Sequence, residues 1–152
     1  MCIDMATTPM PARPGSAGAG PPQALTHERQ AAEAAERHIR DALAALGPGP
    51  ALRLESDAVQ ACDDPTDGGP PGRVFVARRY WLLGADRSAF DTLARFWADH
   101  GYRIVEDRRG TAYPYLWVEH ESDGFRVGID ANAVGDLLLG ASSPCFWPTE
   151  EP

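Results

Sequence analysis

The stretch YLWVEHESDGFRVGIDA, residues 115–131, decides the fold class of this chain. Two runs of alternating apolar and polar residues flank the segment 121–124, whose composition favours a tight turn between antiparallel strands. A turn there sets the register of the hairpin and places Trp117 opposite Gly128. The same register sends one set of side chains inward: Leu116, Val118, Phe125, Val127 and Ile129.

The opposite face of this hairpin is a candidate binding surface, formed by Tyr115, Trp117, Gly128 and Gly140. If residues 132–136 form the next loop, Gly140 lies beside Gly128 and the indole of Trp117 lies across both glycines. A large ring there can simply cover backbone that glycine leaves bare. It can also serve as a flat platform for a sugar, a peptide or a partner's side chain. A third interpretation is that additional coil covers this face.

Strand and helix patterns extend outward from the hairpin. The expected strands are residues 52–60, 73–83, 102–107, 115–120, 125–131 and 137–142, and the expected helices are residues 26–46 and 87–100. Strands interrupted by helices, without strict alternation, indicate an α+β fold in the order α-β-β-α-β-β-β-β. We therefore expect one antiparallel sheet of about five to six strands with both helices packed on one face.

The two expected helices differ in the apolar stripe that each would bury. In the first, Thr26 is the expected N-cap, and the stripe is thin and rich in alanine, so this helix should lie close to the sheet and depend on it. In the second helix, Asp86 is the expected N-cap and Gly101 ends the helix. The expected stripes are Ala32, Ala35, Ile39, Ala42, Leu43 and Leu46 in the first helix and Ala89, Phe90, Leu93, Ala94 and Trp97 in the second.

Composition divides the chain into a leader, one domain and a tail. Residues 1–24 are rich in proline and glycine and cannot bury enough apolar area to offset ordering entropy, so we expect a disordered leader. Residues 25–148 form a single α+β domain, and residues 149–152 form the tail. The aspartates in the loop 62–72 do not match a calcium-binding loop, and a solvated turn is expected.

The net charge of the chain makes some classes of binding partner unfavourable. There are 14 basic residues, all of them arginine, against 22 acidic ones, which gives a net charge of −8. This balance disfavours nucleic acid and anionic membrane surfaces. The pairs Arg78-Arg79 and Arg108-Arg109 are expected at solvated strand ends or loops. No apolar run reaches the length of about 20 residues that a transmembrane helix needs.

The three cysteines are Cys2, Cys62 and Cys145. They form neither a CxxC motif nor a local Cys/His cluster, so no metal site is expected. Cys62 and Cys145 both flank Pro- and Gly-rich coil, where a disulfide would fasten loose ends, and we predict a bridge between them. Two buried free thiols, or a nucleophilic Cys145, are the alternatives. A bridge implies an oxidising compartment.

Three segments carry a resemblance that spans residues 62–148: Gly101-Tyr102, Asp123-Gly124-Phe125 and Ser142-Ser143-Pro144-Cys145-Phe146-Trp147-Pro148. They resemble small cell-envelope lipoproteins and secreted proteins of unknown function from GC-rich Gram-positive bacteria. The resemblance implies a low-complexity stretch before a helix and sheet, and anchoring through a cysteine after a signal peptide. Here Cys2 follows Met1 directly. We expect the cell envelope or secretion if the start is misplaced or a signal was removed, and the cytoplasm if the chain is complete as written.

No catalytic motif is present, and neither a catalytic residue nor a cofactor is expected. His27 and His38 are eleven residues apart on one helix and share no tight face, while the glutamates that flank His120 point away from it. The leading hypothesis is a non-enzymatic, envelope-associated or secreted module that binds an unknown protein or small ligand. One alternative is a cytoplasmic acidic interaction protein of the immunity or chaperone type. The other is a small hydrolase, which requires a pocket joining His120 or His100 to carboxylates.

Overall fold

The computed structural model describes residues 21–62 and 72–147, with the side chains of the first helix described from residue 27 onward. The elements follow in the order α1 (Pro21–Ala45), β1 (Ala51–Ala61), β2 (Val74–Leu83), α2 (Ser88–Asp99), β3 (Tyr102–Asp107), β4 (Tyr115–His120), β5 (Arg126–Ala131) and β6 (Leu137–Ser142). The predicted α+β order is confirmed. Of the expected leader, residues 1–20 lie outside the described residues, whereas residues 21–24 belong to α1, so the expectation of disorder is wrong for them. The expected tail of residues 149–152, residue 148 and most of the loop after Cys62, including Asp63, Asp64 and Asp67, also lie outside the described residues.

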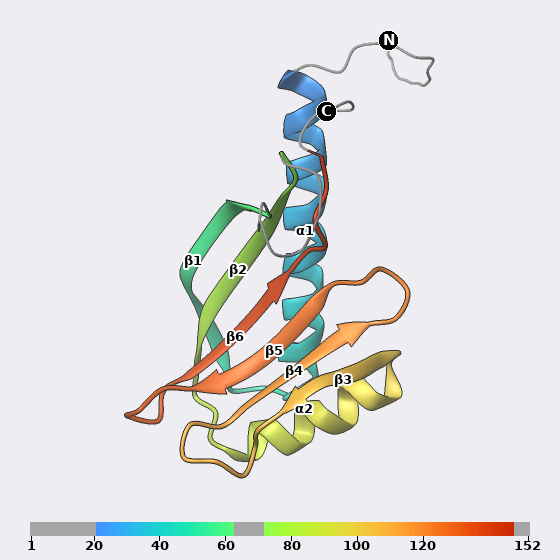
Figure 1. Ribbon diagram of the computed structural model, residues 1–152. Helices are drawn as coiled ribbons and strands as arrows, with labels where there is room; N and C mark the ends of the chain where they lie inside the picture. The colour runs from blue at the N-terminus through green and yellow to red at the C-terminus, as the bar shows by residue number, and fades with distance from the viewer. Residues whose placement is uncertain (1–20, 63–71, 148–152) are drawn as a thin grey trace.

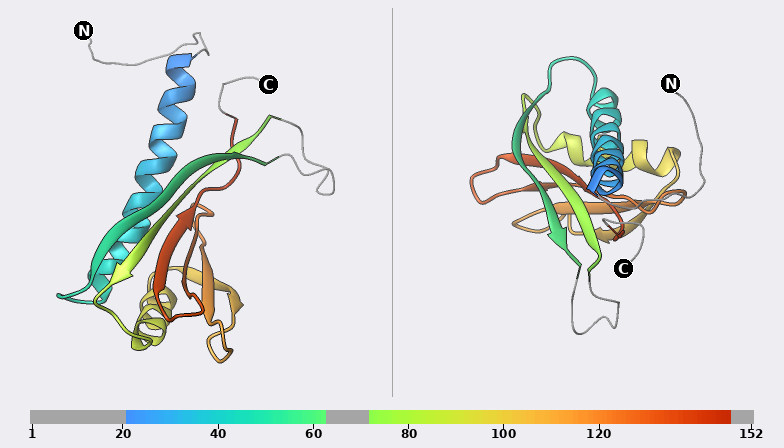
Figure 2. Two further views of the ribbon diagram at one scale, coloured as in Figure 1. Left: turned by 90° about the vertical axis from the view of Figure 1, so that its left-hand side faces the viewer. Right: turned by 90° about the horizontal axis from the view of Figure 1, so that it is seen from above.

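All six strands form one antiparallel sheet in the order β1-β2-β6-β5-β4-β3. Both helices lie on the same side of this sheet, and the twisted β1–β2 hairpin begins near the C-terminal end of α1 and diverges from the helix (Figures 1 and 2). No described element covers the opposite side, which we call the outer face. The fold therefore has one packed face and one open face, as an antiparallel sheet allows.

The register predicted for the central hairpin is confirmed. Trp117 lies opposite Gly128, and Gly128 in turn lies opposite Gly140. The predicted inward side chains are all buried, with exposed fractions from 0% for Leu116, Val127 and Ile129 to 7% for Phe125. The core lies between this face and the two helices, and Leu93 and Trp97 of α2 are almost completely buried in it.

Helix α1 begins earlier than its sequence predicts. It starts at Pro21 instead of after Thr26, so Thr26 lies within the helix and is not its N-cap. Proline is well suited to the first helical turn, because its fixed φ is helical and its missing N–H would have no intrahelical acceptor there. The thin alanine-rich stripe is confirmed, since Ala35, Ile39 and Ala42 are each 0% exposed. Neither described helix is both long enough and apolar enough to cross a membrane.

The two arginine pairs differ in their settings. Arg78 and Arg79 lie within β2, not at a solvated strand end, and each faces carboxylates. Arg78 pairs with Glu36 and Asp57, and Arg79 pairs with Asp130. The expectation failed here because strand β2 lies inside the sheet between β1 and β6, and both of its faces meet acidic side chains. The other pair follows β3 in a loop, as expected.

A disulfide joins Cys62 to Cys145, whose Cα atoms are 6.3 Å apart. Cys62 follows β1, and Cys145 lies three residues beyond β6. Next to the bridge, the backbone of Phe146 pairs with that of Val74 through hydrogen bonds of 2.7 and 2.8 Å. The bridge and this backbone pairing fasten the segment after β6 to the β1–β2 hairpin, as the cysteine positions predict.

Candidate functional site

The first candidate site lies on the outer face, where the strand order brings two rows of side chains together. The first row runs across four strands as Arg79, Gly140, Gly128 and Trp117. The second runs as Trp81, Leu138, Asp130 and Tyr115. We call these eight residues the aromatic face. It contains all four residues of the predicted binding surface and adds an arginine, an aspartate, a leucine and a second tryptophan.

The indole of Trp117 lies directly on the backbone of Gly128. A Cβ atom added at Gly128 would be only 2.4 Å from Cδ2 of Trp117 and within 2.7 Å of two further ring atoms. The ring therefore rests on the sheet and turns its other side outward. Glycine is required here because any side chain would displace the ring.

The second glycine of the row is covered by a different side chain. A Cβ atom at Gly140 would lie 3.1 Å from Cγ of Arg79 and 3.0 Å from the carbonyl oxygen of Arg78. The expectation that Trp117 covers both glycines is confirmed for Gly128, whereas the side chain nearest to Gly140 is that of Arg79. The reason is the strand order, because β2 pairs with β6 and places Arg79 directly beside Gly140.

Arg79 also forms the polar part of this face. Its Nη2 atom lies 3.3 Å from Oδ2 and 3.5 Å from Oδ1 of Asp130. The side chains are 41% and 28% exposed, respectively, so both can contact a ligand. Burial raises the pKa of Asp130, and the positive charge of Arg79 opposes that rise.

The second candidate site lies on the packed side of the sheet, and we call it the histidine cluster: His38, Tyr102, His120 and Asp123. Nε2 of His38 lies 2.8 Å from Oδ2 of Asp123, and Nδ1 of His38 lies 2.5 Å from the hydroxyl of Tyr102. Nδ1 of His120 lies 3.3 Å from Oδ1 of Asp123. Four separate segments supply these side chains: α1, the start of β3, the end of β4 and the following turn.

The cluster lines a cavity of about 320 Å³. The lining residues are Arg37, His38, Asp41, Phe96, His100, Tyr102, His120 and Asp123. Burial raises the pKa of Tyr102 to about 12, with further contributions from the charges of Asp41 and Asp123. For Asp123, burial acts to raise the pKa, but hydrogen bonds from the Phe125 N–H and from His38 hold it below its usual range. The cavity thus keeps an ionised carboxylate beside a neutral phenol.

Sequence patterns do not reveal the histidine cluster. His38 lies within the apolar stripe of α1 and is only 6% exposed, yet its partners are 64 and 85 residues away in the chain. Asp123 has the appearance of an ordinary turn residue. Two features of the sequence could have indicated the cluster. His38 lies on the buried side of its helix, and the strand alternation points His120 inward, where its side chain is 23% exposed. The expectation of no metal site considered only local spacing.

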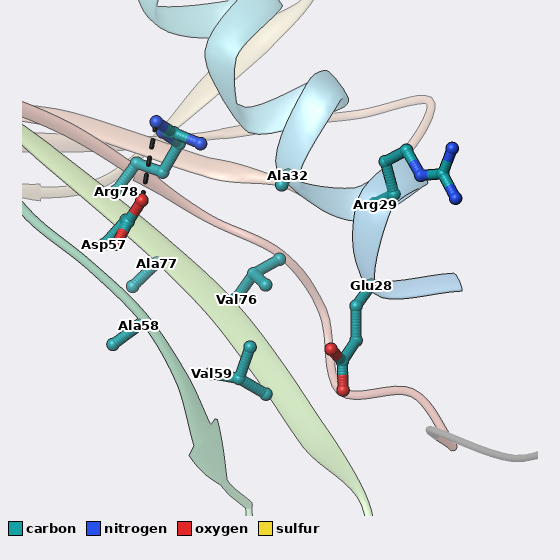
Figure 3. A pocket seen from close by; sticks show the side chains of 9 residues that line it. All are labelled: Glu28, Arg29, Ala32, Asp57, Ala58, Val59, Val76, Ala77 and Arg78. Atoms are coloured by element: carbon teal, nitrogen blue, oxygen red, sulfur yellow. Dashed lines mark ion pairs between the residues drawn. The ribbon is translucent and has the colours of Figure 1, made fainter. Parts of the chain in front are cut away.

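Two further cavities flank α1. One of about 490 Å³ lies between α1 and the β1–β2 hairpin, with Val59 and Val76 in its wall and the ion pair of Arg78 with Asp57 at one end (Figure 3). The other, of about 600 Å³, lies against the segment after β6 and includes Phe146 and Trp147 in its wall. The wall of the first cavity combines apolar side chains with Glu28, Arg29, Asp57 and Arg78, and the wall of the second is mainly apolar.

Comparison of this chain with protein-family models, with curated proteins and with solved structures found no match. The geometry of the aromatic face and of the histidine cluster is therefore the basis for a functional assignment.

Proposed function

We propose that this chain is a non-enzymatic binding module of an oxidising compartment, either the cell envelope or the secreted fraction, and that its aromatic face binds a neutral saccharide. The disulfide between Cys62 and Cys145 supports the choice of compartment, because such bonds persist outside the reducing cytoplasm. The same bridge disfavours the alternative of a cytoplasmic acidic interaction protein, which would contain two free thiols at these positions.

The observation that carries the saccharide proposal is the row from Arg79 to Trp117 on an uncovered sheet face. The two glycines allow the flat indole and the side chain of Arg79 to lie against the backbone, side by side. A sugar ring can place its C–H groups on the electron-rich face of the indole. Its hydroxyl groups can then donate to the carboxylate of Asp130 and accept from the guanidinium of Arg79.

The charge of the aromatic face favours an uncharged ligand. Arg79 and Asp130 neutralise each other, so neither a phosphate nor a basic peptide gains a net electrostatic attraction at this place. The net charge of −8 further disfavours polyanions. An open sheet face offers limited contact area to one sugar ring, so we expect weak affinity per ring, with tighter binding to longer chains.

The test is a titration of the full chain with two series of neutral oligosaccharides, one of glucans and one of N-acetylhexosamines. Binding is monitored by tryptophan fluorescence and by isothermal titration calorimetry. We expect at least one series to bind, with affinity rising with oligosaccharide length. Trp117→Ala should reduce that affinity at least tenfold. Trp147→Ala is the matched control, because Trp147 lies outside the aromatic face, and it should bind like the wild type. Absence of binding in both series, or equal affinity for Trp117→Ala, would overturn the proposal.

A small hydrolase is the second candidate, because the histidine cavity joins His120 and His100 to Asp41 and Asp123. The described residues that line it include bases and carboxylates but no serine, threonine, cysteine or lysine that could act as a nucleophile. Hydrolysis there would use an activated water, or a carboxylate, histidine or tyrosine of the cavity as the nucleophile. Turnover of chromogenic esters that is lost in His120→Ala would favour this candidate, and equal rates in both proteins would exclude it for those substrates.

A further inference from the structure

We propose that the histidine cluster is a binding site for a divalent transition-metal ion of the Zn²⁺ class, with His38, His120 and Asp123 as the ligands. This site is independent of the proposed saccharide function, because it lies on the packed side of the sheet and shares no residue with the aromatic face.

The spacing of the ligand atoms suits a tetrahedral ion. One atom from each of the three side chains lies within 4.8 Å of the others. Nε2 of His38 lies 2.8 Å from Oδ2 of Asp123, and Nδ1 of His120 lies 3.3 Å from Oδ1 of the same carboxylate. Bonds of about 2.0–2.1 Å in tetrahedral geometry place ligand atoms about 3.3 Å apart. One of these two separations equals that value and the other is about 0.5 Å shorter, so small side-chain movements are enough to admit the ion.

The hydrogen bonding of His120 is incomplete without an ion. Its Nδ1 atom is buried and makes no hydrogen bond to any described residue, although Asp123 is close. A buried imidazole nitrogen without a partner is costly, since it has lost its contact with water. A metal ion between His120 and Asp123 would satisfy this nitrogen and the carboxylate together.

Neighbouring groups hold two of the ligands in place. In the metal-bound state Nδ1 of His38 would keep its proton and donate it to the hydroxyl of Tyr102, which leaves Nε2 free to bind the ion. The backbone N–H of Phe125 donates to Oδ1 of Asp123 over 3.0 Å and fixes that carboxylate. Partners of this kind orient metal ligands and raise affinity. Tyr102 would therefore act as a positioning residue.

The donor atoms indicate the class of ion. Two imidazole nitrogens and one carboxylate oxygen favour Zn²⁺ and its transition-metal neighbours over Mg²⁺ and Ca²⁺, which prefer oxygen ligands. Asp41 adds a further negative charge to the cavity wall, while Arg37 is the one arginine among the described residues that line it. The cavity also leaves space for a fourth ligand, as in zinc sites that keep an open position.

The test uses the full chain with its disulfide intact, and Cys2→Ser as background because Cys2 is a further thiol that could bind zinc. Zn²⁺ is titrated against a chromophoric chelator, and Co²⁺ binding is followed by its visible absorption. We expect one ion per chain with micromolar or tighter affinity, a cobalt spectrum of tetrahedral type and a higher melting temperature with Zn²⁺. His120→Ala and Asp123→Asn should each weaken affinity at least tenfold, and Tyr102→Phe by about tenfold.

His100→Ala is the matched control, because His100 lines the same cavity but its Nδ1 atom is 2.7 Å from the carbonyl oxygen of Phe96. It should bind Zn²⁺ like the background protein. Far-ultraviolet circular dichroism checks that each variant is folded, and if His120→Ala fails to fold, His120→Gln replaces it. The proposal is overturned if the background protein takes up no Zn²⁺ at millimolar concentration. It is also overturned if the His120 and Asp123 variants bind as tightly as His100→Ala, since the three side chains would then form only a hydrogen-bonded structural cluster.

Discussion

The contact between Trp117 and Gly128 shows how one residue's lack of a side chain shapes a surface. The indole occupies the space in which a Cβ atom would stand, and so the ring lies flat on the sheet. Covering bare backbone and offering a platform are compatible roles, because the two sides of the ring are used for different purposes. The same atoms can therefore contribute to stability and to binding.

Gly128→Ala should lower the free energy of unfolding by about 1–3 kcal/mol, because the new methyl group would overlap the ring and force it away from the sheet. Chemical denaturation followed by fluorescence measures the change. Gly110→Ala is the control, because nothing lies within 4 Å of a Cβ atom there, and its effect should be small.

A double variant isolates the cause of this effect. When Trp117→Ala has already removed the ring, Gly128→Ala should cost much less than it does in the wild type. Equal costs in both backgrounds would mean that the ring is not what excludes a side chain at Gly128.

At the scale of single residues, the sequence is sufficient for contacts within the hairpin and insufficient beyond it. Trp117 and Gly128 meet because strand residues alternate with a period of two and the turn fixes the register. Arg79 and His38 could not be placed in the same way. The position of Arg79 depends on the pairing of β2 with β6, and that of His38 on where α1 crosses the sheet. Both positions are set by contacts between residues that are far apart in the sequence.

At the scale of elements, α1 illustrates why small residues occupy its buried side. Ala35 and Ala42 are completely buried, and α1 packs against β2, β6 and α2 along its length. Alanine lets a helix approach a sheet closely, but it contributes little apolar area per residue. The helix is therefore held by close fit along its length and by Ile39, the larger buried aliphatic side chain in its stripe.

Ala35→Leu should lower the free energy of unfolding by about 1–3 kcal/mol, because the larger side chain has no space between α1 and the sheet. Thermal and urea unfolding measure the change. Ala44→Leu lies on the exposed side of the same helix and should be nearly neutral, since leucine and alanine have similar helix propensities. A neutral Ala35→Leu would show that the helix can move away from the sheet at little cost.

The elements themselves were largely predictable. Strands β3, β4 and β6 have the bounds that their patterns indicate, because each is short and is limited by turn residues or polar loops. The start of α1 was not predictable in this way. Thr26 is a residue type favoured at the N-cap, while proline, found at Pro21, is favoured in the first helical turn, and the two signals compete. When two start signals of similar strength lie five residues apart, the sequence alone does not decide between them, and the tertiary packing of the helix does.

At the scale of the whole molecule, the disulfide closes a loop across 83 positions of the chain. Reduction should lower the free energy of unfolding by about 4.5 kcal/mol in the loop-entropy account, which is a large part of the stability of a domain of this size. The melting temperature should fall substantially, while the far-ultraviolet spectrum of the folded state should change little, because the strand pairs do not depend on the sulfurs.

Calorimetry with and without reductant, together with the double variant Cys62→Ser/Cys145→Ser, checks this expectation. Cys2→Ser is the matched control and should melt like the wild type. Equal melting temperatures for oxidised and reduced protein would contradict the assigned contribution of the bridge, and loss of the strand signal on reduction would show that the sheet needs it to form.

The path of the chain through this bridge also determines how the protein would respond to being pulled by its ends. Tension would travel from the first residues through α1 and β1 to Cys62, cross the two sulfur atoms to Cys145 and leave by the short tail. Strands β2 to β6 and helix α2 lie inside the closed loop and would carry none of that load along their backbone. A stretched molecule would thus lose α1 and β1 while most of the sheet, including the row from Arg79 to Trp117, stayed outside the line of force.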